Sequence, residues 1–306
     1  MLAASAGAAR FGALRNWRAR RGSCGAHSAR VEPPGRVSYR PTSGDDLMEV
    51  GFLDLAQGIT RLPVALFFSW SDTKARYKRS VLGPFWLVLS TLVGVGGLGL
   101  IWGVLLKVDK AEFIPSLTIG LIIWQLISGS ISEGAGIFYR QAAFIKDINV
   151  PSFFVSIQLI LKQLINFCHN IFVFVIVMII FPEHISVVAF LAIPGLIIVI
   201  LNMVWIIQLL GYVGARYRDL EPLIVTFLPI LFFLSPVVYR ASQLGTLAHI
   251  MTFNPLTYWI GLVRDPILGV VPSFQTYALA AAVTVAGWAA ALWMTASRRH
   301  RLPYWI

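Results

Sequence analysis

The stretch RYKRSVLGPFW, residues 76–86, leads directly into the first long apolar run of the chain, Phe85–Leu106. Its three cations are Arg76, Lys78 and Arg79. We expect them to face a membrane surface, because basic side chains gather beside membrane spans on the cytoplasmic side. Pro84 is typical of a helix start, and Trp86 is typical of headgroup depth. The stretch therefore predicts the cytoplasmic end of a membrane-spanning helix.

The composition of the chain is that of a membrane protein. Apolar residues make up 57% of the 306 residues and charged residues 13%, against roughly 45–50% and 25% in soluble domains. The formal charge of +11 does not indicate a nucleic-acid partner, because the cations lie at the ends of apolar runs. The two cysteines, Cys24 and Cys168, have no metal-ligand spacing, so no metal site is expected.

Residues 1–47 differ from the rest of the chain, with eight arginines among Ala, Ser, Gly and Pro. No continuous apolar core follows the arginines, so the segment is not a secretory signal. Three interpretations stay open: an organellar transit peptide, a disordered tail, or a start codon placed too far upstream, with Met48 as the true start. We therefore expect the membrane domain to be residues 48–306.

Six apolar runs are long enough to cross a bilayer, since a spanning helix needs about 20 apolar residues. The six runs are Phe85–Leu106, Ser116–Phe138, Ser152–Phe181, Ser186–Gly214, Leu220–Tyr239 and Phe274–Ala296. The fifth contains three prolines, and Pro229 is expected to kink its middle. The sequence thus predicts an all-α membrane protein with six spans.

The distribution of Lys and Arg predicts the orientation of these spans. With the amino terminus inside, twelve basic residues lie on the cytoplasmic side: Arg61, Lys74, Arg76, Lys78, Arg79, Arg140, Lys146, Arg216, Arg218, Arg298, Arg299 and Arg301. Four lie on the opposite side: Lys107, Lys110, Arg240 and Arg264. Both termini are therefore predicted to be cytoplasmic.

A short amphipathic helix is predicted ahead of the first span, over Glu49–Thr60. Its apolar face carries Phe52, Leu55, Ala56 and Ile59, at helical spacing. Pro63 is expected to end or bend it. The helix is too short to span, so we expect it to lie in the membrane interface.

The polar segment between the fifth and sixth runs contains two short apolar pieces, Leu256–Val263 and Ile267–Val271. Asn254-Pro255 and Arg264-Asp265-Pro266 flank them. Two short re-entrant helices in the outer leaflet fit this pattern, provided that their backbone is buried in protein or lines a cavity. A helical surface loop is the alternative.

The 306 residues contain no GxxxxGK[ST] phosphate loop, so this chain is not expected to hydrolyse ATP by that mechanism. An ATP-driven motor would have to be a separate chain. Gly94–Gly99 formally contains GxGxxG, but it lies inside a predicted span with no strand before it. Gly99 and Gly103 form a GxxxG pair, which indicates close helix packing within the subunit or at a dimer contact.

Three ionisable residues fall inside or near the ends of predicted spans: Glu133, Lys162 and His169. Glu133 is predicted to pair with Lys162 or Arg140. For His169 we favour a hydrogen bond between helices, although polar groups at this depth also suggest function. A membrane-embedded enzyme that uses His169 is the alternative hypothesis.

Two sets of residues have both a structural and a functional interpretation. The cations of residues 76–79 can hold a lipid pyrophosphate, or they can simply anchor the span. A set of aromatic residues can form interface belts and helix contacts, or line a pore where flat faces hold sugar rings. That set is Trp86, Trp124, Phe232, Phe233 and Tyr239.

Four blocks of the sequence together resemble the membrane subunit of bacterial type-2 ABC exporters for polysaccharides such as O-antigen, capsule or teichoic acid. In chain order they are residues 76–86, Phe144–Pro151, Ala215–Leu220 and Arg301–Ile306. Each is weak alone, but four in the family's order at the right topology are specific. The resemblance covers about Met48–Ile306, and Glu133-Gly134 and His169-Asn170 look most like the O-antigen branch.

This resemblance implies a homodimer of six-span subunits with two copies of an ABC ATPase beneath it. The ATPase would bind ATP and Mg, and this chain would bind no cofactor. The amphipathic helix, with Phe52, Leu55 and Ile59, would act as a cytoplasmic gate beside the cations of residues 76–79. Membrane lipids and a lipid-linked polysaccharide are the other implied partners.

The resemblance also implies two further sites. The coupling element docked in the ATPase would be formed by Phe144, Ile145, Lys146, Asp147, Ile148, Asn149 and Pro151. Asp147 stands where many relatives have a second base, so this contact would differ in charge. On the far side, Asn254, Pro255 and Arg264 would belong to an extracytoplasmic gate.

We therefore predict a non-enzymatic permease of the bacterial cytoplasmic membrane that exports lipid-linked polysaccharide of the O-antigen kind. The nearest alternative is an ABC exporter of a drug or small lipid. An ATP-independent flippase or channel is an alternative from a different class.

Overall fold

The long apolar runs fold as helices because a helix satisfies its own backbone N–H and C=O groups where water is absent. The computed structural model describes residues 44–78, 80–105, 109–148, 150–182, 186–239 and 254–306, with side chains described from residue 48 onward. Every element within these ranges is a helix. The all-α prediction is therefore confirmed for the described part of the chain.

The α-helices are α2 (Gly44–Thr60), α3 (Leu62–Tyr77), α4 (Phe85–Leu105), α5 (Lys110–Arg140), α6 (Ala142–Ile148), α7 (Ser152–Ile180), α8 (Ala192–Arg216), α9 (Leu220–Leu234), α11 (Pro255–Ile267), α12 (Phe274–Arg298) and α13 (Leu302–Trp305). Two short 3₁₀ helices, η2 (Val187–Leu191) and η4 (Arg299–Arg301), precede α8 and α13. α2 begins before Met48, so the predicted boundary of the tail falls inside this helix.

In the described part of the chain, five helical segments are long and apolar enough to cross a membrane: Phe85–Leu105, Lys110–Arg140, Ser152–Ile180, Val187–Arg216 and Phe274–Trp305. The predicted fifth span is shorter than expected, because α9 has only 15 residues and is about 22 Å long at 1.5 Å per residue. It ends where Ser235 turns to an extended conformation before Pro236. Among the described residues, a sixth segment meets the same criteria of length and composition if α2 and α3, bent by 62°, are counted as one.

The bend between α2 and α3 occurs at Arg61, and Pro63 lies in the first turn of α3. Proline is tolerated there because the first N–H groups of a helix have no partner within it. Pro63 thus ends the amphipathic helix as predicted. The sequence analysis did not predict the second helix, α3, which packs on α7 through Ala65, Ser69 and Thr73.

The segment before α12 contains one described helix, α11, where the sequence predicted two. Pro266 lies within the last turn of α11, and Gly269 has a positive φ of 79° that ends the helical path. The second predicted helix, Ile267–Val271, is therefore wrong. Residues 240–253 lie outside the described ranges, including Arg240.

α5 is the central helix of residues 41–306. In its most apolar window 72% of the residues are buried, and it packs against α8, α7, α4 and α9. Glycines allow this close packing: a Cβ on Gly214 of α8 would collide with the Ala135 carbonyl oxygen of α5. A Cβ added to Gly99 would lie 3.4 Å from Ile114 Cγ1 of α5, and one added to Gly103 would lie 3.8 Å from Lys110 Cγ, so the GxxxG pair packs on α5 within the subunit.

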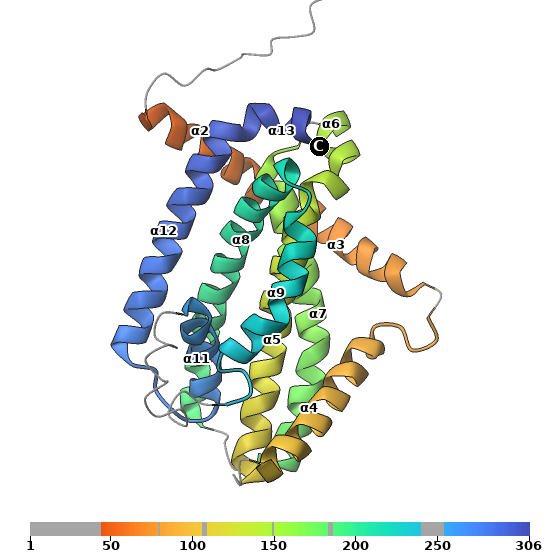
Figure 1. The fold of residues 1–306 in the computed structure, drawn as a ribbon, viewed down its shortest axis with the longest axis vertical. Helices are drawn as coiled ribbons and strands as arrows, with labels where there is room; N and C mark the ends of the chain where they lie inside the picture. Colours follow the sequence, from red (N-terminus) through yellow and green to blue (C-terminus); the bar gives the residue numbers. More distant parts are fainter. Residues whose placement is uncertain (1–43, 79, 106–108, 149, 183–185, 240–253) are drawn as a thin grey trace, which may run out of the picture. The chain divides into compact units, whose positions relative to one another are not determined.

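The ends of the helices form two distinct regions (Figure 1). α2, α6 and α13 lie at one end of the bundle, together with the carboxyl end of α12. α11 lies toward the other end, beside the beginning of α12. We refer to the first region as the α6 end; it is the end that the basic residues predict to be cytoplasmic.

Candidate functional site

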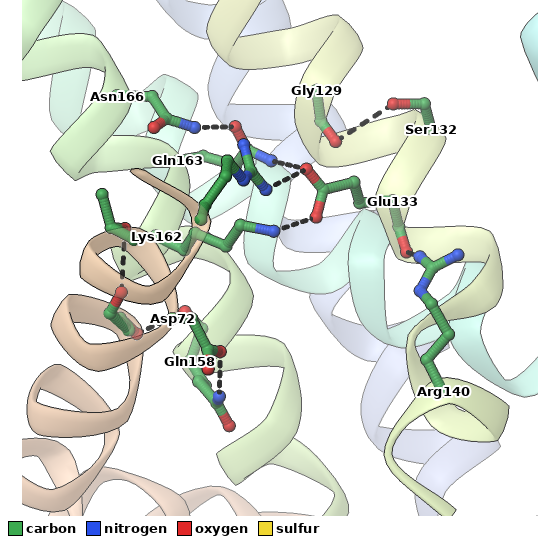
Figure 2. A network of polar contacts seen from close by, with 12 residues as sticks. Asp72, Gly129, Ser132, Glu133, Arg140, Gln158, Lys162, Gln163 and Asn166 are labelled. Atoms are coloured by element: carbon green, nitrogen blue, oxygen red, sulfur yellow. Dashed lines mark hydrogen bonds and ion pairs between the residues drawn. The ribbon is translucent and has the colours of Figure 1, made fainter. Parts of the chain in front are cut away.

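A carboxylate shared by two cations lies in the third of α5 nearest the α6 end (Figure 2). Glu133 Oε2 is 2.5 Å from Lys162 Nζ on α7, and Glu133 Oε1 is 3.8 Å from Arg76 Nη2 on α3. Gln163 Nε2 donates to Glu133 Oε1 at 3.1 Å. The predicted pairing of Glu133 with Lys162 is confirmed. One carboxylate between two cations leaves one positive charge uncompensated within this Glu133 cluster.

The Glu133 cluster is open on one side. The exposed fraction of the side chain rises from 16% for Lys162 through 32% for Glu133 to 43% for Arg76. Lys78 is also exposed, while Arg79 lies outside the described residues. The arrangement can therefore accept an anion from solvent or from lipid headgroups, because basic side chains at a membrane surface attract phosphate.

Arg140 reaches the same region but has a different ion-pair partner. Its guanidinium donates to the Glu133 main-chain carbonyl oxygen, and its ion pair is with Glu221 at 2.6 Å. Tyr139 also donates to the Glu221 carboxylate. This contact joins the end of α5 to the start of α9, and the sequence analysis did not predict it.

A row of amide side chains, which we call the amide line, extends from the Glu133 cluster toward the middle of the spans. Gln163 accepts from Asn166 at 3.2 Å. Further along, Asn170 donates to Gln125 Oε1 and accepts from Thr91 Oγ1, both at 2.8 Å. A cavity of about 100 Å³ lies beside these amides. Such a line of amides and its cavity can hold water or hydroxyl groups between α4, α5 and α7.

His169 does not make the hydrogen bond between helices that the sequence predicted. Its Nδ1 lies 2.7 Å from the Ile165 carbonyl oxygen of its own helix, and among the described residues no hydrogen bond joins it to another span. The neighbouring Asn170 makes the interhelical contacts instead. Ser130 and Ser132 donate to carbonyl oxygens of their own helix. The described residues thus bring together no serine–histidine pair for an enzyme.

The predicted coupling element folds as α6 and the residues after it. Ile145 is buried, and the Phe144 ring stacks on Phe154 of α7 with 5.8 Å between ring centroids. Lys146, Asp147 and Ile148 are exposed, Ile148 to 58%. α6 is therefore held by one face, and its other face is exposed.

Asn149 lies outside the described residues. Pro151, the last residue of the predicted element, is the N-cap of α7. The last residue of the predicted coupling element thus lies at the start of a helix that is long enough to span the membrane.

The amphipathic helix α2 contacts the rest of the protein through a face that the sequence analysis did not identify. Gly51, Asp54 and Gly58 are buried against α7 and α12. Phe52 and Ile59 are both 54% exposed, while Leu55 is half-buried. The apolar face thus points away from the protein, which is the orientation needed to lie in a membrane interface.

Asp54 fixes α2 to the beginning of α7. Its Oδ2 accepts from Ser152 Oγ at 2.9 Å and from the Phe153 N–H at 3.0 Å, and its Oδ1 lies 3.4 Å from Arg299 Nε. Burial raises the pKa of this carboxyl, while the Phe153 N–H and the charge of Arg299 oppose the rise. The i, i+3, i+7 spacing of Gly51, Asp54 and Gly58 was the sequence signal for this face.

Four of the five predicted pore aromatics lie together. Trp124 of α5 meets Phe232 of α9 edge to face at 5.5 Å, and Phe232 contacts Phe233 at 5.2 Å. Tyr239 donates to the Phe233 carbonyl oxygen at 2.7 Å. Trp124 is only 8% exposed, whereas Phe233 is 60% exposed. Phe233 is thus free to face a pore, while Trp124 supports the cluster from behind.

The fifth aromatic residue, Trp86, lies apart from this cluster at the start of α4 and is 54% exposed. That place agrees with the headgroup depth predicted from the sequence.

The predicted extracytoplasmic residues hold the irregular segment after α9. The buried guanidinium of Arg264 donates to the Pro236 carbonyl oxygen at 2.6 Å. Asn254 caps α11 at Leu256 and donates to Ser235 Oγ at 3.1 Å. Non-helical backbone can lie at membrane depth when protein buries it, so Asn254 and Arg264 stabilise the short form of the fifth span.

Pro255, the third residue of the predicted extracytoplasmic gate, is in the first turn of α11 and is exposed. It therefore starts the helix rather than contacting the irregular segment.

These features define a helical membrane protein with a row of polar side chains between its spans, a short helix α6 with one exposed face and an outward-facing amphipathic helix. The ABC-2 type transporter family matches residues 65–268. The chain belongs to this family of ABC transporter membrane proteins and is a multi-pass membrane protein.

Particular relatives come from two bacteria. The O-antigen export system permease protein RfbA of Klebsiella pneumoniae is 24% identical over 196 residues, which cover 63% of this chain and 76% of the relative. A second protein of that name from the same species is 23% identical over 208 residues, covering 67% and 80%. The one from Myxococcus xanthus is 22% identical over 197 residues, covering 60% and 72%.

Proposed function

We propose that this chain is the permease subunit of an ABC exporter that moves lipid-linked polysaccharide of the O-antigen kind across the bacterial inner membrane. The observation that carries the proposal is the similarity to O-antigen export permeases over 72–80% of their length. Membership of the ABC-2 type transporter family supports it independently.

The energy would come from a separate ABC ATPase that binds ATP and Mg, with two copies serving two copies of this chain. The lack of a phosphate loop in these 306 residues supports the assignment of ATP hydrolysis to a separate chain. The exposed face of α6 would dock in the ATPase. Because α6 leads into α7 and contacts α5, movement of the ATPase would be transmitted directly to two spans.

The substrate would enter at the α6 end. A lipid-linked polysaccharide carries a pyrophosphate, and the surplus positive charge of the Glu133 cluster, together with Lys78, is suited to bind it. The exposed face of α2, with Phe52 and Ile59 outward, would lie in the interface beside this site and act as the gate. Arg79 would add to the positive charge.

The glycan would pass between two copies of this chain. α4 and α9 support this, because both expose long apolar faces in the single protomer. Phe233 would present its ring to passing sugars, as flat aromatic faces do in sites with few polar anchors. Arg264 and Asn254 would set the shape of the outer gate by holding residues 235–239.

Transport in proteoliposomes tests the proposal. The permease would be reconstituted with its ATPase, with an ATPase unable to hydrolyse ATP, and alone. We expect the lipid-linked glycan to cross only in the first sample. Equal transport in all three samples would indicate an ATP-independent flippase or channel. Transport of a drug or small lipid, but not of the glycan, would support the alternative cargo.

A further inference from the structure

The last residues of the chain are held against the coupling helix. Lys146 Nζ of α6 donates to the Ile306 main-chain oxygen at 2.5 Å. The Arg216 guanidinium at the end of α8 lies over the Trp305 ring, 5.6 Å from its centroid. Leu302 is buried, with 3% of its surface exposed. α13 is therefore a fixed neighbour of α6 and of the α8–α9 connection (Figure 1).

Around these contacts, the ends of α6 and α8 and the short helix α13 expose large side chains. Tyr304 is 87% exposed, and Tyr217 and Ile148 are each 58% exposed. Exposed apolar residues along the spans would face lipid or a second copy of the chain. By contrast, Ile148 ends α6, Tyr217 follows α8 and Tyr304 lies in α13. A group of exposed apolar side chains with a polar rim is typical of a protein interaction surface.

The same surface is positively charged. Its cations are Lys146, Arg216, Arg218, Arg299 and Arg301, and its carboxylates are Asp147 and Asp219. Arg299 is already paired with Asp54, so the other four cations and the two carboxylates give the surface a net charge of +2. This charge would attract an acidic partner and speed its association. The carboxylates lie among the cations, which favours a protein partner over an anionic membrane, because two acids on a lipid-binding face would be repelled by its headgroups.

We propose that residues 146–148, 216–219 and 299–306 form one composite surface that binds the ABC ATPase, so that docking extends from α6 to the carboxyl-terminal residues. The complement on the ATPase is an apolar pocket for Tyr304 with an acidic rim that faces Arg301. This inference rests on the proposed function, since it takes the ATPase as the partner. It adds a contact that a coupling helix alone does not provide.

Affinity measurements on the full-length protein in nanodiscs test this inference. Tyr304→Ala is expected to lower the affinity for the ATPase about tenfold, as expected for a buried aromatic anchor. Arg301→Glu is expected to slow association and to do so most at low salt. Matched controls lie at the other end of the molecule. Phe274→Ala removes an aromatic ring that is also 87% exposed, and Lys110→Glu reverses an exposed cation.

The outcomes separate this inference from the proposed function. If the unchanged protein binds no ATPase, the proposed function is wrong. If it binds, and only Ile148→Ala weakens binding while Tyr304→Ala and Arg301→Glu do not, docking is confined to α6 and the inference is overturned. A defect that appears only in nanodiscs with phosphatidylglycerol, and not with phosphatidylcholine alone, assigns the surface to lipid and also overturns it. Thermal unfolding of each variant verifies that it is folded.

Discussion

Asp54 and Glu133 are both carboxylates near the α6 end, yet their surroundings differ in kind. Asp54 is fully buried and accepts from a side chain and a main-chain N–H at the start of α7. Glu133 is 32% exposed and is shared by Lys162 and Arg76. Asp54 has a structural role, because it joins α2 to the start of α7. Glu133 is shared by two cations, so one positive charge of the Glu133 cluster stays accessible to a ligand. A charged residue near a membrane is therefore structural or available for ligands according to what surrounds it.

The difference has a physical cause in helix geometry. The first N–H groups of a helix lack partners within it, and the helix dipole favours a negative group there. Asp54 supplies such a partner for α7, because its carboxylate accepts from the Phe153 N–H in the first turn. Glu133 lies in the interior of α5, where the backbone is already hydrogen-bonded, so only other side chains can pair with it.

The largest expected effect is that of Asp54→Ala. It would leave the hydroxyl of Ser152 and the N–H of Phe153 without an acceptor in a buried place, at a cost of about 1–3 kcal/mol. We expect a lower thermal unfolding midpoint in detergent and faster proteolysis of α2. Glu49→Ala is the control, since Glu49 is an exposed acid of the same helix. Equal unfolding midpoints for both variants would show that Asp54 does not hold α2.

A double-mutant cycle on Glu133 and Lys162 sharpens the comparison. Glu133→Gln leaves Lys162 without its carboxylate, and Lys162→Met removes the need for one. Because the pair is partly exposed, we expect a coupling free energy of about 1 kcal/mol. The free energies of unfolding of the two single variants and the double variant give this coupling. A value near zero would mean that the two groups do not interact in the membrane.

Arg76→Ala tests whether the surplus charge of the Glu133 cluster binds phosphate. A basic residue near an anionic surface contributes roughly 1 kcal/mol, so the affinity for a polyprenyl pyrophosphate lipid should fall about fivefold. Binding to nanodisc-embedded protein measures this, and added salt should reduce the difference. Lys74→Ala removes an exposed cation of the same helix that belongs to no described ion pair. An equal loss in both variants would indicate unspecific attraction.

The smallest expected effect is that of Asn170→Ala, which removes the hydrogen bonds to Thr91 and Gln125. Hydrogen bonds between membrane helices contribute about 0.6 kcal/mol on average. We expect a stability loss of that order and normal ATP hydrolysis by the complex. A complete loss of transport in a stable Asn170→Ala protein would instead give the amide line a direct part in translocation.

The sequence predicted the spans best where apolar runs are long and unbroken. Four of the six predicted runs correspond closely to α4, α5, α7 and α12, and a fifth to η2 with α8. The prediction of a full-length fifth span was wrong: Leu220–Tyr239 is mostly apolar and long enough to cross, but residues after Leu234 leave the helix. Asn254 and Arg264, distant in sequence, provide the partners that make this possible.

The sequence likewise predicted some contacts of the candidate site and missed others. The pairing of Glu133 with Lys162 followed from two charges near the ends of neighbouring spans, which rarely stay unpaired in a membrane. Asp54 lies outside the apolar face that the sequence predicted for α2, and the structure buries it. The spacing of Gly51, Asp54 and Gly58 marks a face for close packing, but α2 itself does not indicate that α7 and α12 are the helices beside it.

The sequence by itself determined that this protein lies in a membrane, where most of its helices run and that no phosphate loop lies within its 306 residues. Local composition suffices for these, because bilayer thickness and backbone hydrogen bonding act on each segment separately. Only the tertiary structure decided which carboxylate is buried, how the fifth span ends and that α13 lies on α6. Those features depend on contacts between residues far apart in the chain.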